Sequence, residues 1–343
     1  MNAVGIDIGG ANLKTAHVDG RTLTRSFQIW KSPDQLPEAL SELLAEFPEI
    51  DVLAVTMTAE LADCFESKAA GVDFILRAVE QVAGTTPISV WQTGAEFVTP
   101  EVAREIPLLV AAANWHALAT WVGRMVPESA AILIDVGSTT TDIIPLLDGV
   151  PVPRRLTDVE RLQSGELVYS GVRRTPLCAI ARSVPFREGS CPLAAEVFAT
   201  SLDVYLTLGS IAKNSNDRDT ANGRPATVAC AHDRLARMLC CDSSEFTAQD
   251  AEIMADFLAN VQKQQITGAL NRVLANLTEH CECKHVLISG SGAFLAERIV
   301  REHSKLKSAK LISLAETFDD DLSLAACAMA VARLGSERLT GLA

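Results

Sequence analysis

VGIDIGGANLK, at Val4–Lys14, decides how this chain folds. An apolar run ends in Asp7, and a glycine turn at Gly9 and Gly10 follows it directly. These residues predict two strands joined by a tight turn. Backbone N–H groups in such a turn point into one concavity that suits phosphate oxygens, and the aspartate is suited to hold a metal ion or its waters.

The same arrangement returns at Ala131–Asp142, AILIDVGSTTTD, where Asp135 ends the apolar run. An Asp-Gly turn closes each hairpin, at Asp19-Gly20 and at Asp148-Gly149, which indicates an internal duplication. An ordinary polar hairpin explains either loop alone, but the pair is more specific. The predicted phosphate-binding residues are Gly9, Gly10, Asn12, Gly137, Ser138, Thr139, Thr140 and Thr141, with Lys14 as a point charge.

Alternating strand and helix patterns predict an α/β fold of two lobes, each with a sheet flanked by helices and with a cleft between them. A break at Pro127–Ser129 divides the chain into an N-terminal lobe, 1–128, and a C-terminal lobe, 129–343. Whether the final helix packs back on the first lobe is left open. Single helices are expected over Leu108–Met125 and Leu193–Leu208, and a polar surface loop over Lys213–Pro225.

Gly290, Ser291 and Gly292 follow an expected strand at His285–Ser289 and precede a helix. A turn of this shape can hold a base, a ribose or a phosphate at the helix N-terminus. Close packing of strand and helix is the alternative explanation.

Other polar residues each have a functional and a structural interpretation. Glu60 and Asp63 can orient a metal or act as a general base, or else cap the next helix. Arg173 and Arg174 can clamp a phosphate or a carboxylate, or else lie in solvent. Asn114, inside an apolar helix, binds either substrate or backbone.

Composition excludes several classes of function. The net charge of −13 argues against nucleic acid as a partner. The most apolar long run, Ile106–Val122, contains Asn114 and His116, so a buried helix explains it better than a membrane span. The chain opens on a strand rather than a signal peptide, and nine cysteines then indicate reduced thiols in a cytoplasm. We expect small-molecule substrates and leave a homodimer open.

The three glycine-bearing loops, in this order, resemble those of the sugar kinase, Hsp70 and actin superfold, which implies actin-like (ribonuclease H-like) lobes with mixed sheets. Four further segments are similar to the hydantoinase/oxoprolinase-related family, and most of all to its members linked to tetrahydromethanopterin-dependent C1 transfer and methanofuran biosynthesis. These segments are TMTAELADCF at Thr56–Phe65, AANW at Ala112–Trp115, GELVYSGVRRTPL at Gly165–Leu177 and GSGAFL at Gly290–Leu295.

The resemblance implies a transferase that joins a furan-2-ylmethylamine diphosphate to the phenol of γ-glutamyltyramine and releases pyrophosphate. It implies Mg²⁺ on Asp7 and Asp135, with Asp142 as a further candidate. Asp135, Lys14 and either Glu60 or Asp63 are the implied catalytic residues, with Lys14 as a rival base. The implied substrate-binding residues are Asn114, Arg173 and Arg174, the arginines for the glutamyl carboxylates.

The sequence also departs from the family pattern. The first loop reads GGANLK where hydantoinases and oxoprolinases carry a GGTFTD-like loop, so ATP-driven ring opening is not expected. Ser291 stands where the adenosine turn often has glycine, which leaves ATP binding open. The alternatives are an ATP-dependent small-molecule kinase or ATPase, and a non-catalytic, nucleotide-binding actin-like protein.

Overall fold

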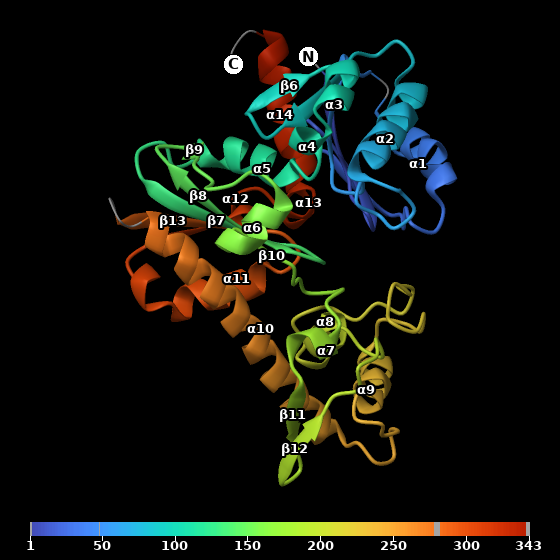
Figure 1. The fold of residues 1–343 in the computed structure, drawn as a ribbon, viewed down its shortest axis with the longest axis vertical. Coiled ribbons are helices and arrows are strands. Elements are labelled where there is room, and N and C mark those ends of the chain that lie inside the picture. Colours follow the sequence, from blue (N-terminus) through green and yellow to red (C-terminus); the bar gives the residue numbers. More distant parts are fainter. Residues whose placement is uncertain (1, 48, 278–281, 341–343) are drawn as a thin grey trace.

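A computed structural model describes residues 2–47, 49–277 and 282–340. The first lobe is built on a six-stranded mixed sheet in the order β3-β2-β1-β4-β5-β6 (Figure 1). Its strands are β1 (Ala3–Ile8), β2 (Asn12–His17), β3 (Thr22–Ser26), β4 (Val52–Met57), β5 (Ile88–Gln92) and β6 (Glu96–Val98). The helices of this part are η1 (Pro33–Gln35), α1 (Leu36–Leu44), α2 (Lys68–Ala83), α3 (Pro100–Glu105) and α4 (Pro107–Val110).

The second lobe contains a second mixed sheet, in which β10, β8, β7, β13 and β14 are neighbours in that order and β9 pairs with β8. Its strands are β7 (Ala130–Val136), β8 (Thr141–Leu147), β9 (Val150–Pro151), β10 (Leu167–Val168), β13 (Cys283–Ser289) and β14 (Lys310–Ser313). Helix α5 (Asn114–Gly123) falls within the predicted 1–128 lobe but contacts β8 and β9 of the second sheet as well as β5 of the first. The other helices of this part are α6 (Asp158–Ser164), α11 (Ala293–Glu302), η2 (Ser304–Leu306), α12 (Leu314–Thr317) and α13 (Asp320–Leu324).

An extension projects from the second lobe below the first lobe in Figure 1. The long helix α10 (Ala248–Leu277) connects the extension to the second sheet. The other elements of the extension are α7 (Leu177–Ile180), β11 (Ser183–Phe186), β12 (Gly189–Pro192), α8 (Ser201–Thr207) and α9 (Val228–Arg237).

The last helix, α14 (Ala326–Thr340), packs against β1 and β4 of the first lobe and against α5. Its backbone comes so close to β1 that a Cβ atom on Gly5 would lie 1.9 Å from the carbonyl oxygen of Ala328. Only glycine fits at that contact. The C-terminal helix therefore starts beside the carboxyl end of β1, where Asp7 lies.

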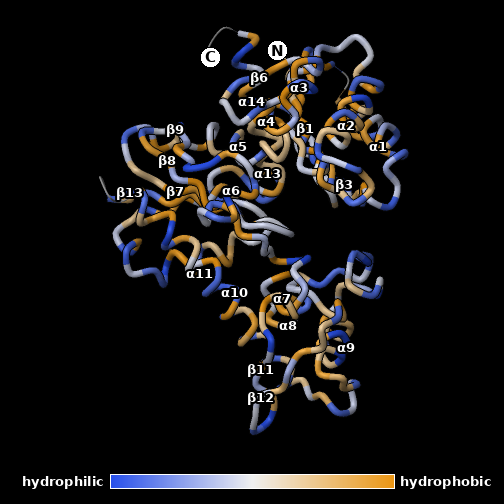
Figure 2. The backbone as a smooth tube through the Cα atoms, viewed as in Figure 1, coloured by the Kyte–Doolittle hydropathy of each residue, from blue (hydrophilic) through white to orange (hydrophobic). Residues whose placement is uncertain are grey.

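Continuous apolar runs explain why the central strands are buried. Every residue of β1 and β4 is buried, as is typical of strands covered on both faces. Figure 2 shows hydrophobic residues along the central strands and hydrophilic residues in the loop between α8 and α9. A shared core containing Trp91, Trp115, Leu133 and Val331 joins the two lobes behind the cleft.

The single helix predicted over Leu108–Met125 is wrong. Helix α4 ends at Val110, and α5 begins at Asn114. Ala111 instead forms a parallel bridge with Met57, and Ala112 has a left-handed φ of 48°. Pairing with the sheet edge therefore overrides the helical propensity of the alanines, and it brings the turn beside the end of β4.

The helix predicted over Leu193–Leu208 is wrong in its first half, because α8 begins only at Ser201. Tertiary bonds hold the preceding chain: the N–H of Leu193 donates to the carbonyl of Arg182, and that of Ala194 donates to the carbonyl of Met238. Thr200 and Asp203 then form a capping box that starts the helix.

Candidate active site

The two phosphate hairpins have the same backbone plan. In the first, Gly9 N–H donates to the Asn12 carbonyl at 3.0 Å. In the second, Gly137 N–H donates to the Thr140 carbonyl at 2.8 Å. Because both turns span the same number of residues, each hairpin holds its aspartate at the same position relative to the loop.

Asp7 and Asp135 end the central strands of opposite lobes and act on each other electrostatically. Burial raises the pKa of both carboxyl groups, while the positive charge of Lys14 lowers the pKa of each. Hydrogen bonding to Asn114 also lowers that of Asp7. A single cation therefore faces acids from both lobes, and the hairpins share one site.

The two aspartates differ in their hydrogen bonds. Oδ1 of Asp7 is buried without a partner among the described residues. Oδ1 of Asp135 accepts from Ser289 Oγ at 2.5 Å, which fixes its orientation. A buried carboxylate oxygen without a donor is costly unless a ligand, ion or water supplies one. Asp7 Oδ1 is therefore a buried acceptor that a ligand, ion or water would complete, whereas Asp135 lines the cavity with one oxygen held by Ser289.

A cavity of about 310 Å³ lies between the lobes at these hairpins. The first lobe contributes Asn12 and Lys14, and α14 contributes Cys327. The second lobe contributes residues of its phosphate loop, the glycine turn and the arginine pair, namely Asp135, Gly137, Ser138, Arg173, Arg174, Gly290 and Ser291. Residues predicted from three separate loops therefore line one cavity.

Asp142, a predicted metal ligand, is already paired. Arg161 Nη2 donates to its Oδ1 at 2.7 Å, and the Arg161 guanidinium lies 3.8 Å from the centre of the Trp115 ring. Burial raises the pKa of Asp142 to about 6, against the opposing effect of Arg161. Because the arginine side chain is 1% exposed, Asp142 is its counter-ion.

Glu60 is buried at the end of β4, and its Oε2 has no partner among the described residues. Burial raises its pKa to about 7, although the N–H of Ala112 and the charge of Lys68 lower it. The turn at 112–114 therefore reaches both Glu60 and Asp7. Asp63, its predicted alternative, is exposed, and the following helix α2 is capped by Ser67 rather than by either acid.

The segment 171–174 supports the second phosphate loop. The N–H groups of Arg173 and Arg174 both donate to the Ser138 carbonyl at 3.0 Å. From α10, the amide nitrogen of Gln262 holds Ser170 Oγ and the Gly171 carbonyl, each at 2.8 Å. The long helix thus fixes the loop that presents both arginines.

The arginine pair connects the lobes. The Arg174 guanidinium lies 4.4 Å from the centre of the Trp30 ring, which belongs to the first lobe. Arg173 Nη2 donates to Asp217 Oδ2 at 2.6 Å. The chain beside Trp30 is itself bound to the first phosphate loop, since Ile29 N–H donates to the Gly10 carbonyl. Segments that support the two loops therefore meet across the cleft.

Three residues predicted to bind a phosphate or a nucleotide have a structural role, either through a hydrogen bond or through close backbone packing. Thr141 Oγ1 donates to the Ser170 carbonyl at 2.8 Å, so its proton is already used. Gly290 has a φ of 86°, and a Cβ there would lie 2.5 Å from Asp135 Oδ1. Gly292 N–H donates to the Val136 carbonyl. Ser138, Thr139 and Thr140 remain partly exposed at the loop.

Known proteins resemble this chain over most of its length. The family model for hydantoinase/oxoprolinase matches residues 51–338. The chain belongs to the hydantoinase/oxoprolinase family. Within that family, a relative from Methanocaldococcus jannaschii is 35% identical over 340 residues, which cover 98% of each chain. Another, from Methanococcus vannielii, is 31% identical over 60% of this chain and 91% of its own. Both relatives are named (4-{4-[2-(γ-L-glutamylamino)ethyl]phenoxymethyl}furan-2-yl)methanamine synthase.

The fold also matches solved structures. A proposed N-acetylmannosamine kinase from Listeria monocytogenes aligns with a TM-score of 0.50 over 99% of this chain and 100% of its own, at 15% sequence identity. At that identity the likeness shows the fold alone. It confirms the α/β architecture of two actin-like lobes with mixed sheets flanked by helices.

Several residues at the site escape sequence analysis. Arg161 lies on the short helix α6. Thr157 and the left-handed Gly165 mark the start and end of this helix in the sequence, but neither residue indicates that Arg161 contacts Asp142. Trp30 and Asp217 are distant in sequence from the loops they serve.

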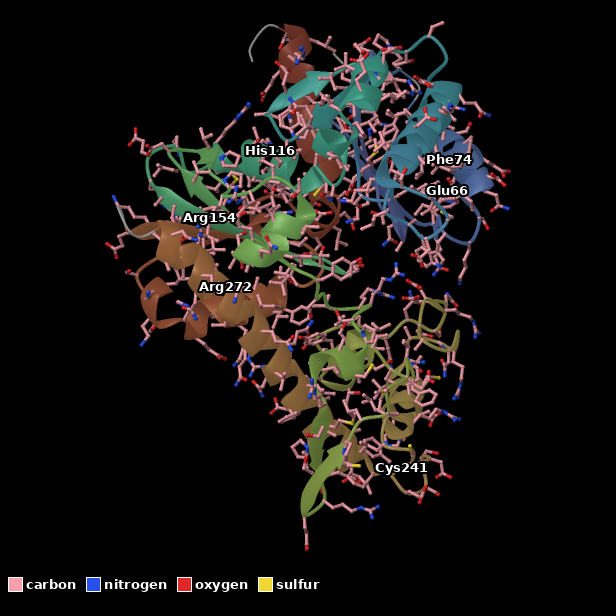
Figure 3. The ribbon with its side chains drawn as sticks, in the orientation of Figure 1. Glu66, Phe74, His116, Arg154, Cys241 and Arg272 are labelled. Carbon is pink, nitrogen blue, oxygen red and sulfur yellow. The ribbon has the colours of Figure 1, made fainter. Side chains whose placement is uncertain are left out.

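The described helices include none with the length and apolar character of a bilayer span. Figure 3 places Cys241 at the far end of the extension, remote from the cleft.

Proposed function

We propose that this chain forms an aryl ether between a furan-2-ylmethylamine diphosphate and the phenol of γ-glutamyltyramine, with release of pyrophosphate. The product is the compound for which both relatives are named. The observation that carries the proposal is one cavity lined by Lys14 and Asp135 and by residues of both phosphate loops. Asp7 is buried behind this lining, where the charge of Lys14 acts on it as on Asp135. Such a cavity suits a small polyanion, and it agrees with near full-length similarity to the synthases.

In this reaction the bond between the furan methylene carbon and the diphosphate oxygen breaks, and the diphosphate leaves with the electron pair. The phenol oxygen forms the new bond to the methylene carbon and gives up its proton. Since the furan ring delocalises charge at that carbon, stabilising the leaving diphosphate is the main task. Lys14 and Ser138 line the cavity, and we assign this task to the Lys14 ammonium, the hydroxyls of Ser138 and Thr139, and the loop N–H groups.

Glu60 is the proposed general base. Its pKa of about 7 suits a group that accepts a proton near neutral pH, and its buried Oε2 has no hydrogen-bond partner among the described residues. The turn that acts on Glu60 through Ala112 also acts on Asp7 through Asn114. This link supports an arrangement in which proton removal and diphosphate binding occur side by side. We assign Asn114, Arg173 and Arg174 to substrate binding.

Mg²⁺ is the proposed cofactor, with Asp7 and Asp135 as its protein ligands. Among the described residues, no group of three or more histidine, cysteine or acidic side chains is arranged to hold a metal. Two carboxylates nevertheless fit Mg²⁺, which usually completes its octahedron with phosphate oxygens and water. The ion would supply positive charge against the diphosphate. Asp142 does not join this set, because Arg161 binds it.

The direct test combines the purified protein with Mg²⁺, the furan diphosphate and γ-glutamyltyramine. Mass spectrometry should detect the ether, and an enzymatic assay should detect one pyrophosphate for each ether. Asp135→Asn should abolish turnover while circular dichroism shows a folded protein. If instead ATP is hydrolysed or a substrate is phosphorylated while the furan diphosphate is not consumed, the kinase alternative replaces this proposal.

A further inference from the structure

The cavity contains an ion pair at a position that suits a phosphate group. Arg173 Nη2 donates to Asp217 Oδ2 at 2.6 Å, and both residues line the cavity together with Lys14 and Ser138. A guanidinium beside a phosphate-binding loop is a strong partner for phosphate oxygens. Asp217 therefore places an anionic group where a bound diphosphate would place its own.

Exposure separates this pair from a structural one in the same extension. The side chains of Arg173 and Asp217 are 26% and 21% exposed. Those of Arg234 and Asp203, paired at 2.7 Å, are 0% and 1% exposed. Breaking a fully buried pair leaves an unsolvated charge, whereas a partly exposed pair contributes little and separates readily. The pair that lines the cavity is the exchangeable one.

The loop that carries Asp217 is held by bonds that do not need Arg173. Asp217 Oδ1 accepts from Asp219 N–H at 2.9 Å, and the Asp217 carbonyl accepts from Ala226 N–H at 2.9 Å. At the base of the loop, Asn214 N–H donates to the Ala226 carbonyl at 2.8 Å. Oδ2 can therefore release the arginine without unfolding the loop.

The same loop also reaches the first lobe. Gln28 Nε2 donates to Asp219 Oδ1 at 2.7 Å across the cleft. In Figure 1 this loop, between α8 and α9, extends from the extension toward the edge of the first lobe. A change at Asp217 is thus two residues away from a contact between the lobes.

We propose that Asp217 competes with the diphosphate for Arg173, so that donor binding replaces Asp217 Oδ2 on the guanidinium with a phosphate oxygen. The inference rests on the proposed function, because it takes a diphosphate as the ligand. It changes the assignment of Arg173 from the glutamyl carboxylates to the donor. Asp217 thereby sets how tightly donor and pyrophosphate are held, and keeps Arg173 paired in the empty cavity.

Titration calorimetry with inorganic pyrophosphate and Mg²⁺ tests this exchange. Asp217→Asn keeps the side-chain shape and removes the competing charge, so it should bind pyrophosphate about fivefold more tightly, as expected for loss of one exposed ion pair. Asp233→Asn is the matched control. It removes an equal charge from the Arg224–Asp233 pair, which is at 2.7 Å in the same region but outside the cavity lining, and it should bind like the wild type.

The double variant Arg173→Met/Asp217→Asn should lose the gain, because the arginine is the proposed shared partner. Unchanged or weaker pyrophosphate binding by Asp217→Asn would overturn the inference, as would a gain that persists without Arg173 or no binding by any protein. Ether formation is scored separately. Ether production without tighter pyrophosphate binding by Asp217→Asn would contradict only the exchange at Arg173. Tighter binding without ether production would contradict only the proposed reaction.

Discussion

The hairpins of the two lobes share a backbone but differ in the residue opposite each acid. In the first lobe Asp7 is the cross-strand partner of Lys14, while in the second Asp135 is the partner of Asp142. Lys14 lines the cavity. Asp142 instead binds Arg161, whose side chain is almost fully buried. The two equivalent positions therefore differ in function. Lys14 is a cation at the cavity, whereas Asp142 pairs with a buried cation, Arg161, inside the second lobe.

The difference extends to the hydrogen bonds around each hairpin. In the first lobe, oxygens of Asp7, Thr56 and Glu60 are buried without partners among the described residues. In the second, Asp135 is bound by Ser289 and Thr141 by the Ser170 carbonyl. Unpartnered buried polar groups cost stability and are retained where a ligand completes them. At the two aspartates themselves, the first lobe therefore has the carboxylate oxygen without a partner, and the second has the one fixed by a hydrogen bond.

Apart from loss of a proposed Mg²⁺ ligand, the largest effect on activity should come from Glu60→Gln. If Glu60 is the base, ether formation should fall about 10³-fold, within the usual range for loss of a general base. The wild-type rate should rise with pH through about 7, where Glu60 ionises, and this rise should be absent in the variant. Rate measurements from pH 5 to 9 check this, and an unchanged profile would remove Glu60 from the mechanism.

The pH dependence of folding stability tests the protonation of Glu60 independently of activity. Burial raises the pKa of folded Glu60 from 4.5 to about 7, so the folded state holds the proton more tightly than the unfolded chain does. The wild type should therefore lose stability as pH rises through that window. Glu60→Gln should melt above the wild type at pH 8 and with it at pH 4. Equal melting temperatures at both pH values would contradict the buried, unpartnered carboxyl.

Asp142→Asn should mainly destabilise the fold. The variant leaves the Arg161 guanidinium buried without a counter-ion, which should lower the free energy of unfolding by about 3 kcal/mol. Urea unfolding measures this loss. Asp142→Asn/Arg161→Met removes both charges and should recover much of it. A single variant as stable as the wild type would mean that Asp142 is not needed to neutralise Arg161.

Lys14→Met provides the opposite result at the equivalent position. Loss of the ammonium should reduce kcat/KM about 100-fold, as for removal of one group that stabilises developing charge. Because Lys14 is only partly buried, and because Asp7 and Asp135 can each take up a proton once its charge is gone, unfolding should change by less than in Asp142→Asn. Lys14→Arg should keep part of the activity. A stability loss as large as that of Asp142→Asn would erase the distinction between the lobes.

The smallest effect is expected at the contact between lobes. Trp30→Ala removes the ring under Arg174, which is assigned to the glutamyl carboxylates, and should raise the KM for γ-glutamyltyramine about fivefold, the size of one cation–π contact. Trp30→Phe retains a ring and should lie between the two. Steady-state kinetics with varied γ-glutamyltyramine decides the point, and a kcat loss without a change in KM would argue against a role of Trp30 in positioning Arg174 for substrate binding.

Sequence analysis places the hairpins well because strand, acid and glycine turn are encoded locally. The apolar runs that end in Asp7 and Asp135 set both acids at strand ends, and the fold brings those ends together. Sequence analysis cannot show that the charge of Asp142 is neutralised, because Arg161 reaches Asp142 from a separate helix. Nor can sequence analysis choose between Glu60 and Asp63. The two acids are three positions apart in the sequence, but Glu60 is buried and Asp63 is exposed. Glu60 lies beside Ala112, next to the bridge between Ala111 and Met57, and contacts of this kind between distant segments are not encoded locally.

The central claim is that acids from opposite lobes act together on one diphosphate. Titration calorimetry with pyrophosphate, in the presence and absence of Mg²⁺, measures this for the wild type, Asp7→Asn and Asp135→Asn, with the turn variant Asp148→Asn as control. The account predicts that either site variant alone lowers Mg²⁺-dependent affinity by more than about tenfold, while the control binds normally. Wild-type Mg²⁺-dependent binding by Asp7→Asn or by Asp135→Asn would contradict it.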